Sequence, residues 1–445
     1  MNCKVIAKGV IALLSKRFAG PFWFRRRQLA KTQWWSQQEL DKLQLKLLKR
    51  LITHSYNTVP YYRKLMDQHH IKSEGIKRLE DIKQFPILTK NDVLLAGDSI
   101  VSTMYPRWLL AKAFTGGTTG TPLMLHRNIF SIGNEHAFVR RQWDWAGIGL
   151  SDKCAFLTGR LIVPPDKQDG QLFAYDPFMK ELILSTYHLS QKTAQDYALL
   201  MKQYKVKAIV GYPSAVYFLA RTCLDSGIEV KLKSALTSSE VLTESMRQTI
   251  EKAFGCKVFD FYGGAERVCY IHTCEHGCYH IIPEYGLTEL VPIDDTIGDK
   301  CKIISTGFWN LAMPLIRYDI GDVVVMSNNN CTCGRAFQVI KSVIGREADT
   351  IKTPSGRKFG PAILTHVLYG TAHIAESQII QDKLDHITVE YVPSEKFSTK
   401  DLKDFEGLIA QHLPSELSVE FKQVKAVQRT SSGKIRPVVS LMGKV

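Results

Sequence analysis

Hydrophobic side chains recur at helical spacing over residues 37–66, so this stretch predicts an amphipathic helix. Pro60 disfavours continuation, and we expect the helix to end just before it. The stretch 77–95 predicts a helix, a break at Pro86 and a second helix that Thr89 caps. The apolar positions of the first helix are Leu43, Leu45, Leu47, Leu48, Leu51 and Ile52.

Farther along the chain, short apolar runs alternate with helical patterns. The expected order is strand 207–210, helix 214–226, strand 234–237, helix 243–254 and strand 258–261. Strands and helices that alternate at this spacing predict crossover connections and a largely parallel sheet. The runs 287–295 and 302–306 are also extended, and there we expect antiparallel pairing.

A different unit is expected to begin near Gly345. It contains strand-like runs at 387–392 and 419–427, a helical run at 401–412 and a Ser/Gly turn at 431–433. A chain of 445 residues is too long for one ordinary core. We therefore predict an α/β fold with a large N-terminal domain, 1–344, whose mixed, largely parallel sheets are flanked by helices and which starts with a helical segment, 1–70. A small, mobile α+β domain, 345–445, follows it.

Composition and charge narrow the classes of partner. With 45% hydrophobic and 23% charged residues, the chain is neither disordered nor embedded in a membrane. A formal charge of +15 favours anionic partners, such as nucleotides, phosphorylated cofactors, acidic carrier proteins or an anionic membrane face. The basic residues are spread along the chain and form no known nucleic-acid-binding motif, so we expect no nucleic-acid partner.

The N-terminal apolar stretch, 5–14, is too short to span a bilayer, and no signal-cleavage site follows it. We predict a cytoplasmic protein. Packing of this region onto the main domain is the favoured interpretation, and peripheral contact with the inner membrane face is the alternative. That contact would use Ile6, Ile11, Leu13, Phe18, Phe22 and Trp23 with the nearby arginines.

The strongest local signal is the Gly/Thr-rich run 114–122, which reads Phe-Thr-Gly-Gly-Thr-Thr-Gly-Thr-Pro. Glycines let the backbone approach phosphate oxygens, and threonine hydroxyls add hydrogen bonds or help to position a magnesium-bound phosphate. The run lacks the Gly-Lys-Ser/Thr ending of a Walker loop. By itself, such a turn is structural about as often as it binds a ligand.

Two further motifs would serve a nucleotide. In the run 261–266, the ring of Tyr262 can cover an adenine that Gly263 admits, and Glu266 can bind magnesium. In the run 317–322, Asp322 can accept both ribose hydroxyls. A solvated loop acid and a structural turn are the alternatives for these two carboxylates.

The last two motifs are the run 345–352, which contains Arg346, and the run 429–436, which contains Lys434. A lysine on a flexible Ser/Gly loop can place its ammonium against a carboxylate oxygen and an α-phosphate as charge develops in the transition state. A single lysine on such a loop is usually only solvated, so this interpretation depends on the other motifs.

These five motifs, in this order, resemble the acyl-adenylate-forming superfamily of acyl-CoA synthetases and adenylation domains. Within it, the chain is most similar to the phenylacetate–CoA ligase and coenzyme F390 synthetase branch, particularly its CapK-like members, which are associated with polysaccharide biosynthesis. Further residues carry the resemblance in the runs 57–63, 211–214, 238–240 and 312–319.

The resemblance implies that ATP activates a carboxylic acid as acyl-AMP, and that the acyl group then passes to CoA or another acceptor. It implies ATP, Mg²⁺ and CoA as cofactors, and Lys434, Glu266, Thr118 and Thr119 as catalytic residues, with Glu266 binding the magnesium. The implied cofactor-binding residues are Thr115, Gly116, Gly117, Gly120, Ser239, Glu240, Tyr262, Gly263, Asp322 and Arg346. We also expect a homodimer.

One departure from the family pattern supports alternatives. At the hinge, Ala348 stands where relatives often have an acidic residue. The acyl or aminoacyl group would then go to a sugar, carrier protein or amine. A further alternative is a nucleotide-binding assembly protein of envelope polysaccharide synthesis that has lost turnover. We favour the enzyme because the proposed catalytic and nucleotide-binding residues are all present.

Cysteine and histidine residues in two short segments predict a metal site. The first segment offers Cys274, His276, Cys278 and His280, and Cys331 and Cys333 follow about fifty positions later. Thiolates and imidazoles in two loops suit a tetrahedral, structural zinc ion. The preferred ligands are Cys274, His280, Cys331 and Cys333, with Cys278 as the substitute. Ordinary reduced cysteines are the alternative.

Overall fold

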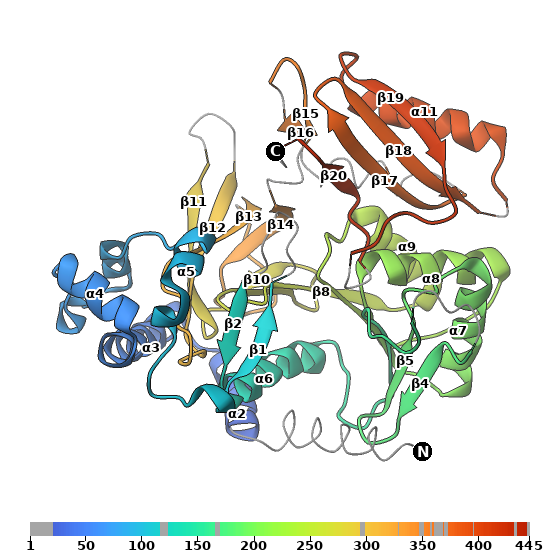
Figure 1. Ribbon diagram of the computed structural model, residues 1–445. Helices are drawn as coiled ribbons and strands as arrows, with labels where there is room; N and C mark the ends of the chain where they lie inside the picture. The colour runs from blue at the N-terminus through green and yellow to red at the C-terminus, as the bar shows by residue number, and fades with distance from the viewer. Residues whose placement is uncertain are drawn as a thin grey trace. The chain divides into compact units, whose positions relative to one another are not determined.

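The computed structural model describes residues 21–115, 123–164, 170–293, 299–327, 329–346, 351–356, 358–359, 368, 373–394, 396–430 and 434–442 (Figure 1). The chain forms two compact units, each from two stretches: Met1–Gly147 with Phe261–Val343, and Ile148–Asp260 with Ile344–Val445. Strand β8 (Lys257–Gly263) carries the chain from the second unit back into the first. The predicted division into domains 1–344 and 345–445 stays a prediction.

Helices of the first unit begin and end where the local sequence requires. Ser36 caps α3 through a capping box with Glu39, and α3 ends just before Pro60, as predicted. Pro60 then occupies the first turn of α4, where its missing N–H costs nothing. Thr89 caps α5, also as predicted, although the segment before it is 3₁₀ rather than α-helical. The helices are α2 (Phe22–Thr32), α3 (Gln37–Thr58), α4 (Pro60–Gln68), η2 (Ser73–Gly75), η3 (Leu79–Gln84), α5 (Lys90–Ala96), η4 (Gly97–Ile100), η5 (Arg107–Leu109) and α6 (Ile129–Trp145).

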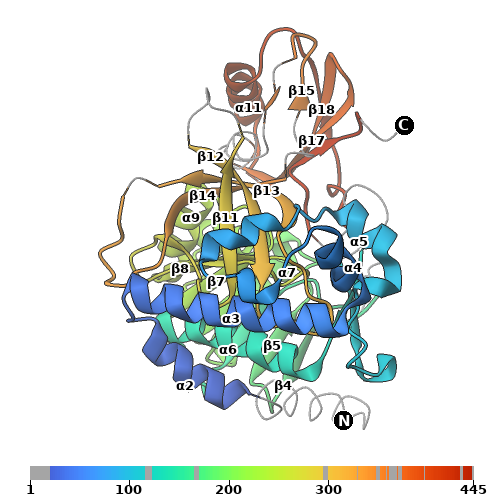
Figure 2. The ribbon, with the colours of Figure 1, turned by 90° about the vertical axis from the view of Figure 1, so that its left-hand side faces the viewer.

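The sheet of this unit has the strand order β11-β12-β13-β14-β10-β9-β8. The registered pairs β8–β9, β9–β10, β10–β14, β11–β12 and β12–β13 are all antiparallel, which confirms the pairing expected for the two extended runs. Helix α3 crosses the face of strands β11 to β13 and buries Leu48, Leu51 and Ile52 completely (Figure 2). The strands are β9 (Tyr270–Thr273), β10 (Tyr279–Ile281), β11 (Gly286–Pro292), β12 (Lys300–Gly307), β13 (Tyr318–Met326) and β14 (Val339–Arg346).

In the second unit, strands and helices alternate as the apolar pattern predicts. Strands β5, β3, β6 and β7 pair in parallel, and β4 adds an antiparallel edge. Helices α7, α8 and α9 form the connections and pack on one another. The elements are β3 (Cys154–Leu157), β4 (Phe173–Asp176), β5 (Glu181–Leu184), α7 (Gln191–Gln203), β6 (Ala208–Gly211), α8 (Pro213–Ser226), β7 (Ser234–Ser238) and α9 (Glu244–Phe254).

The C-terminal part of this unit is a sheet of order β19-β18-β17-β20 that α11 covers (Figure 1). Phe405 of α11 is fully buried between Tyr391 and Phe421. Strand β17 was not predicted, because buried polar residues such as Gln378 and Gln381 hide its apolar pattern. The elements are β15 (Ile351–Lys352), β16 (Lys358–Phe359), β17 (Ile374–Lys383), β18 (His386–Pro393), α11 (Thr399–His412), β19 (Ser418–Gln423) and β20 (Val438–Ser440).

The predicted α/β class is therefore confirmed, with parallel strands concentrated in the second unit. Among the described residues, no helix combines the length and apolar character needed to cross a bilayer.

Candidate functional site

The predicted phosphate loop joins the two strands of a hairpin, β1 (Ala111–Phe114) and β2 (Met124–Arg127). Its residues Gly116, Gly117, Thr118, Thr119 and Gly120 lie outside the described residues. Thr115, at the base of the loop, is buried. Its N–H donates to the Leu123 carbonyl at 3.0 Å, and its hydroxyl accepts from the Leu123 N–H at 3.0 Å. Thr115 thus ties the end of β1 to the residue that precedes β2.

Tyr262 and Asp322, which the sequence assigns to adenine and ribose, meet in the first unit. The phenol of Tyr262, at the end of β8, donates to Asp322 Oδ2 at 2.6 Å. Burial, and then the charge of Asp322, raises the pKa of Tyr262 well above its ordinary value, so the phenol remains a donor. This bond orients the carboxylate of Asp322.

Glu266 lies in the same unit, just after the glycine turn. Its side chain is 9% exposed, and Tyr318 donates to its Oε1 across a long 3.5 Å contact. A Cβ at Gly264 would lie 2.5 Å from Glu266 Oε2, so only glycine leaves this carboxylate its position. A buried, weakly bonded carboxylate oxygen is a suitable ligand for a hard cation such as magnesium.

Arg127, which sequence reasoning missed, connects two of the predicted motifs. It ends the hairpin strand β2, and its guanidinium donates to the Ala265 carbonyl, directly before Glu266. Burial, and then the neighbouring Arg267, lowers the pKa of Arg127 to about 10, so the group stays charged at neutral pH. Nothing in the sequence distinguishes Arg127 from other strand-end arginines, because its partner is 138 positions away.

The second unit brings together a different set of predicted residues. Strand β6 ends at Gly211, where a Cβ would approach the Leu157 carbonyl to 2.8 Å, and Tyr212 then precedes α8. Glu240 Oε2 accepts from the Ser214 N–H at 3.1 Å, in the first turn of α8. Ser239 holds a left-handed backbone, φ +72°, a conformation that is costly for a non-glycine residue. Such strain is common where a side chain must be aimed at a ligand.

Lys434 lies in this second set. Its Nζ is 5.4 Å from the centroid of the Tyr212 ring, a cation–π distance. The Thr430 N–H donates to the Lys434 carbonyl at 2.9 Å, and the Lys434 N–H donates to Thr430 Oγ1 at 3.2 Å. These bonds close the loop whose tip, 431–433, lies outside the described residues. Lys434 is thus half-buried and held in place, unlike an ordinary solvated lysine.

The Oε1 atom of Glu240 is buried, and among the described residues it has no hydrogen-bond partner. Burial raises the pKa of Glu240, and the charges of Lys434 and Arg429 oppose that shift. An unpaired, buried acceptor suits a ligand that brings a hydroxyl or amino donor.

Glu240→Gln is expected to stabilise the protein increasingly as pH rises. Because the folded state raises the pKa of Glu240, its stabilising contribution is complete below the ordinary glutamate pKa and declines as pH rises through the folded value. Glutamine does not titrate. The difference in melting temperature between variant and wild type should therefore be more positive at neutral than at acidic pH. A difference that is flat with pH would contradict the raised pKa.

Arg346, the other predicted ribose residue, ends strand β14. Residues 347–350, including Ala348 of the predicted hinge, lie outside the described residues. The structure therefore groups Tyr262, Glu266 and Asp322 in the first unit, and Ser239, Glu240 and Lys434 in the second.

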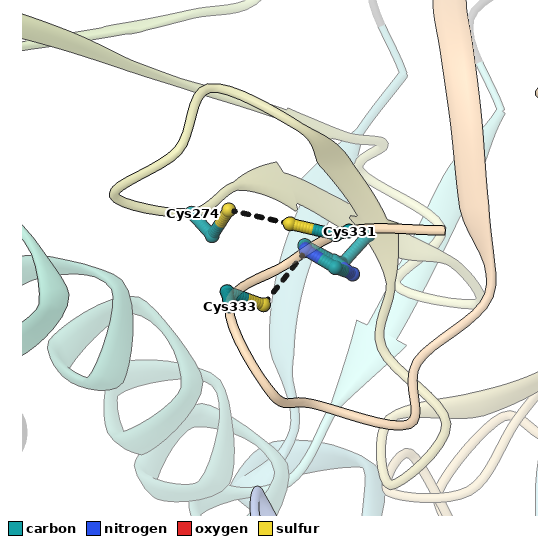
Figure 3. A group of neighbouring side chains, drawn as sticks. Cys274, Cys331 and Cys333 are labelled. Atoms are coloured by element: carbon teal, nitrogen blue, oxygen red, sulfur yellow. Dashed lines mark hydrogen bonds between the residues drawn. The ribbon is translucent and has the colours of Figure 1, made fainter. Parts of the chain in front are cut away.

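The predicted metal ligands come together in the first unit. The ligand atoms of Cys274, His280, Cys331 and Cys333 all lie within 4.8 Å of one another, whereas Cys278 is not a member of this group. Cys274 faces Cys331 with 3.5 Å between the sulfurs, and Cys333 Sγ lies 3.4 Å from His280 Nε2 (Figure 3). With typical zinc bond lengths, a tetrahedron has S···S and S···N edges of about 3.8 and 3.5 Å. The two distances therefore fit a closed tetrahedral site.

Surrounding contacts prepare these side chains as ligands. His280 Nδ1 contacts the Phe337 carbonyl at 3.4 Å, which favours the tautomer whose Nε2 is free to bind a metal. The His276 N–H donates to Cys274 Sγ at 3.3 Å, as amides often do to metal-bound thiolates. The His276 side chain contacts the Thr332 hydroxyl at 2.7 Å and so links the two segments. The arrangement suits a structural metal, because four protein ligands leave no open position for chemistry.

Comparisons with known proteins show which proteins this chain resembles. Residues 351–440 match the family model of the CapK C-terminal domain. The chain is 25% identical to Protein CapK of Staphylococcus aureus, over 98% of this chain and 95% of that protein. It is 26% identical to phenylacetate-coenzyme A ligase of Thermus thermophilus, over 71% of this chain and 72% of the relative.

Among solved structures, a 2-hydroxyisobutyryl-CoA ligase in the postadenylation state, in complex with R3-HIB-AMP, matches with a TM-score of 0.71. The identity is 18%, and the match covers 92% of this chain and 91% of the other. A likeness at this identity shows a shared fold. The anthranilate CoA ligase AuaEII, in complex with anthranoyl-AMP, matches with a TM-score of 0.52 and 14% identity, over 75% of this chain and 66% of that one.

Proposed function

We propose that this chain, which is similar to CapK over almost its whole length and to the phenylacetate–CoA ligases over about 71% of it, activates a carboxylic acid with ATP. A carboxylate oxygen attacks the α-phosphorus, and the bond to the β,γ-phosphates breaks. Acyl-AMP forms and pyrophosphate leaves. A nucleophile, in our proposal the thiol of CoA, then loses its proton and attacks the acyl carbon, and AMP leaves.

The residues of the first unit serve the nucleotide in this proposal. Tyr262 and Gly263 bind the adenine, and Asp322 binds the ribose hydroxyls together with Arg346. Glu266 binds the Mg²⁺ that shields the triphosphate charge, and Arg127 holds the Glu266 loop against the phosphate hairpin. The loop residues 115–120 hold the phosphates, and Thr118 and Thr119 act on them directly.

We assign three further residues to the reacting centre in this proposal. Lys434 supplies a positive charge to the carboxylate oxygen and the α-phosphate as negative charge moves between them. Ser239 and Glu240 add contacts to the nucleotide, and the unpaired Glu240 Oε1 accepts one of its donors.

One observation supports this assignment most strongly. Tyr262 and Asp322, which the sequence assigns separately to the same nucleotide, are sixty residues apart and share a 2.6 Å hydrogen bond. Tyr262 ends β8 and Asp322 lies in β13, so this bond brings together two residues that the sequence assigned separately to one ligand.

The experiment that tests the function is a screen of carboxylic acids for pyrophosphate release from ATP and Mg²⁺, with and without CoA. We expect at least one acid to stimulate release, and CoA to increase its turnover. If amines, sugars or carrier proteins increase turnover and CoA does not, CoA is not the acceptor. Absence of release with every acid would contradict the proposed function.

Tyr262→Phe is expected to raise the KM for ATP by about tenfold or more, because it removes a buried hydrogen bond to a charged group. The measurement is pyrophosphate release at varied ATP. Tyr197→Phe is the matched control, since it removes a phenol that bonds only backbone carbonyls of the second unit. Equal KM values for Tyr262→Phe and wild type would contradict the assignment of Asp322.

We further propose that the four-residue cluster of Cys274, His280, Cys331 and Cys333 binds structural zinc. The ion would join the segment between β9 and β10 to the segment between β13 and β14.

A further inference from the structure

Helix α2 presents two chemically different faces. Phe22, Leu29 and Thr32 are almost fully buried on its inner face. On the opposite face, Trp23 is 39% exposed and Phe24 is 71% exposed. At 100° per residue, Arg27 and Lys31 share this outer face with the two aromatic rings, and both are exposed. The outer face is defined here as Trp23, Phe24, Arg27 and Lys31.

The three consecutive arginines of α2 have three different environments. The guanidinium of Arg25 lies 3.6 Å from the Trp309 ring centroid, and its Nε donates to Asn134 at 3.0 Å. Arg26 pairs with Asp144 of α6, which runs beside α2 (Figure 2). Within the described part of the chain, no carboxylate forms an ion pair with Arg27 or Lys31. Arg25 and Arg26 therefore attach the helix, while the cations of the outer face remain available to a partner.

The surrounding sequence strengthens the positive charge of this region. Residues 1–38 contain eight Lys and Arg residues and no Asp or Glu, since Glu39 is the first acidic residue of the chain. Trp34, just beyond the end of α2, is 56% exposed. A partner of this face must therefore be anionic.

The exposed rings indicate what kind of anionic partner fits. An acidic polymer or protein would need the cations but would gain little from Phe24 at 71% exposure. The boundary layer of a bilayer accepts aromatic rings among its headgroups and attracts cations to its anionic lipids. We propose that the outer face of α2 binds the anionic surface of a lipid bilayer. The membrane contact expected from the sequence includes Phe22. In the structure Phe22 packs inward, so the proposed contact uses Trp23 and Phe24 instead.

The membrane proposal and the ligase proposal can fail separately. The outer face of α2 contains none of the residues proposed for the nucleotide, the metal or the reacting centre. Its variants should therefore retain acid-dependent pyrophosphate release, which serves as the folding control.

Cosedimentation of the full chain with lipid vesicles tests the proposal. We expect binding to phosphatidylcholine vesicles that contain about one third phosphatidylglycerol, and little binding to phosphatidylcholine alone. High salt should weaken the binding. Failure to bind the mixed vesicles at low salt would overturn the proposal.

Two variants locate the contact. Arg27→Glu with Lys31→Glu should lower the partition coefficient of the protein between the mixed vesicles and water by about tenfold or more. Phe24→Ala should lower the same coefficient several-fold. Matched controls on α7 are Lys192→Glu with Lys202→Glu for charge and Leu199→Ala for apolar area, since all three residues are exposed. Binding that these controls reduce as much as the α2 variants do would overturn the proposal. The proposal would also be overturned if Arg27→Glu with Lys31→Glu lost vesicle binding while Phe24→Ala bound as well as the wild type. That result would indicate a purely ionic surface, which fits an acidic polymer instead.

Discussion

Lys434→Ala is expected to slow acid-dependent pyrophosphate release by about 10²- to 10³-fold, because one preorganised charge that acts on a transition state is worth that much. The ammonium of Lys434 lies over the Tyr212 ring, and the Lys434 backbone bonds to the N–H and the hydroxyl of Thr430, so the residue needs little ordering before the reaction. The measurement is the single-turnover rate of pyrophosphate release with the acid that the screen identifies.

Lys425→Ala is the matched control, since Lys425 is an exposed lysine of the same part of the chain. Its rate should equal that of the wild type. If Lys434→Ala forms acyl-AMP as fast as Lys425→Ala does, Lys434 has no part in adenylation. A variant that fails on adenylation yet transfers the acyl group from added acyl-AMP would assign Lys434 to the first step only.

Loss of one ligand from the cysteine and histidine cluster is expected to have the largest effect on stability. We expect purified protein to carry about one zinc ion per chain, and Cys331→Ser to lose it. The free energy of unfolding should fall by several kcal/mol, because structural zinc contributes about 10 kcal/mol or more to small domains. Metal analysis and thermal unfolding measure the two effects.

Cys278→Ser is the control for this prediction. Cys278 lies four positions from Cys274 but is not one of the four residues whose ligand atoms all lie within 4.8 Å of one another. Its variant should keep the metal and the wild-type melting temperature. Zinc loss in Cys278→Ser, or full zinc content in Cys331→Ser, would contradict the ligand set.

Local sequence signals predicted the parts of the fold that depend on local physics. The end of α3 before Pro60 and the cap of α5 at Thr89 follow from backbone sterics and from one side-chain hydrogen bond. The parallel strands of the second unit follow from apolar runs alternating with helices. Strand β17 was missed because its buried glutamines bond to backbone groups that only the folded chain supplies, such as the Lys352 carbonyl for Gln381.

In the candidate site, too, the residue types could be predicted from the sequence, whereas the contacts between distant residues could not. Motifs in the sequence singled out Tyr262, Asp322 and the four residues of the cysteine and histidine cluster, because each residue type carries its chemistry with it. The bond between Tyr262 and Asp322 and the role of Arg127 depend on long-range pairing, which no spacing reveals.

The central claim, adenylation of a carboxylic acid, can be tested by following oxygen. The full chain is given ATP, Mg²⁺, an acceptor and an acid whose carboxylate carries ¹⁸O, and the products are examined by mass spectrometry. Attack of the carboxylate on the α-phosphorus predicts that AMP acquires one labelled oxygen and that pyrophosphate acquires none. Label in inorganic phosphate with release of ADP, or unlabelled AMP, would contradict the account.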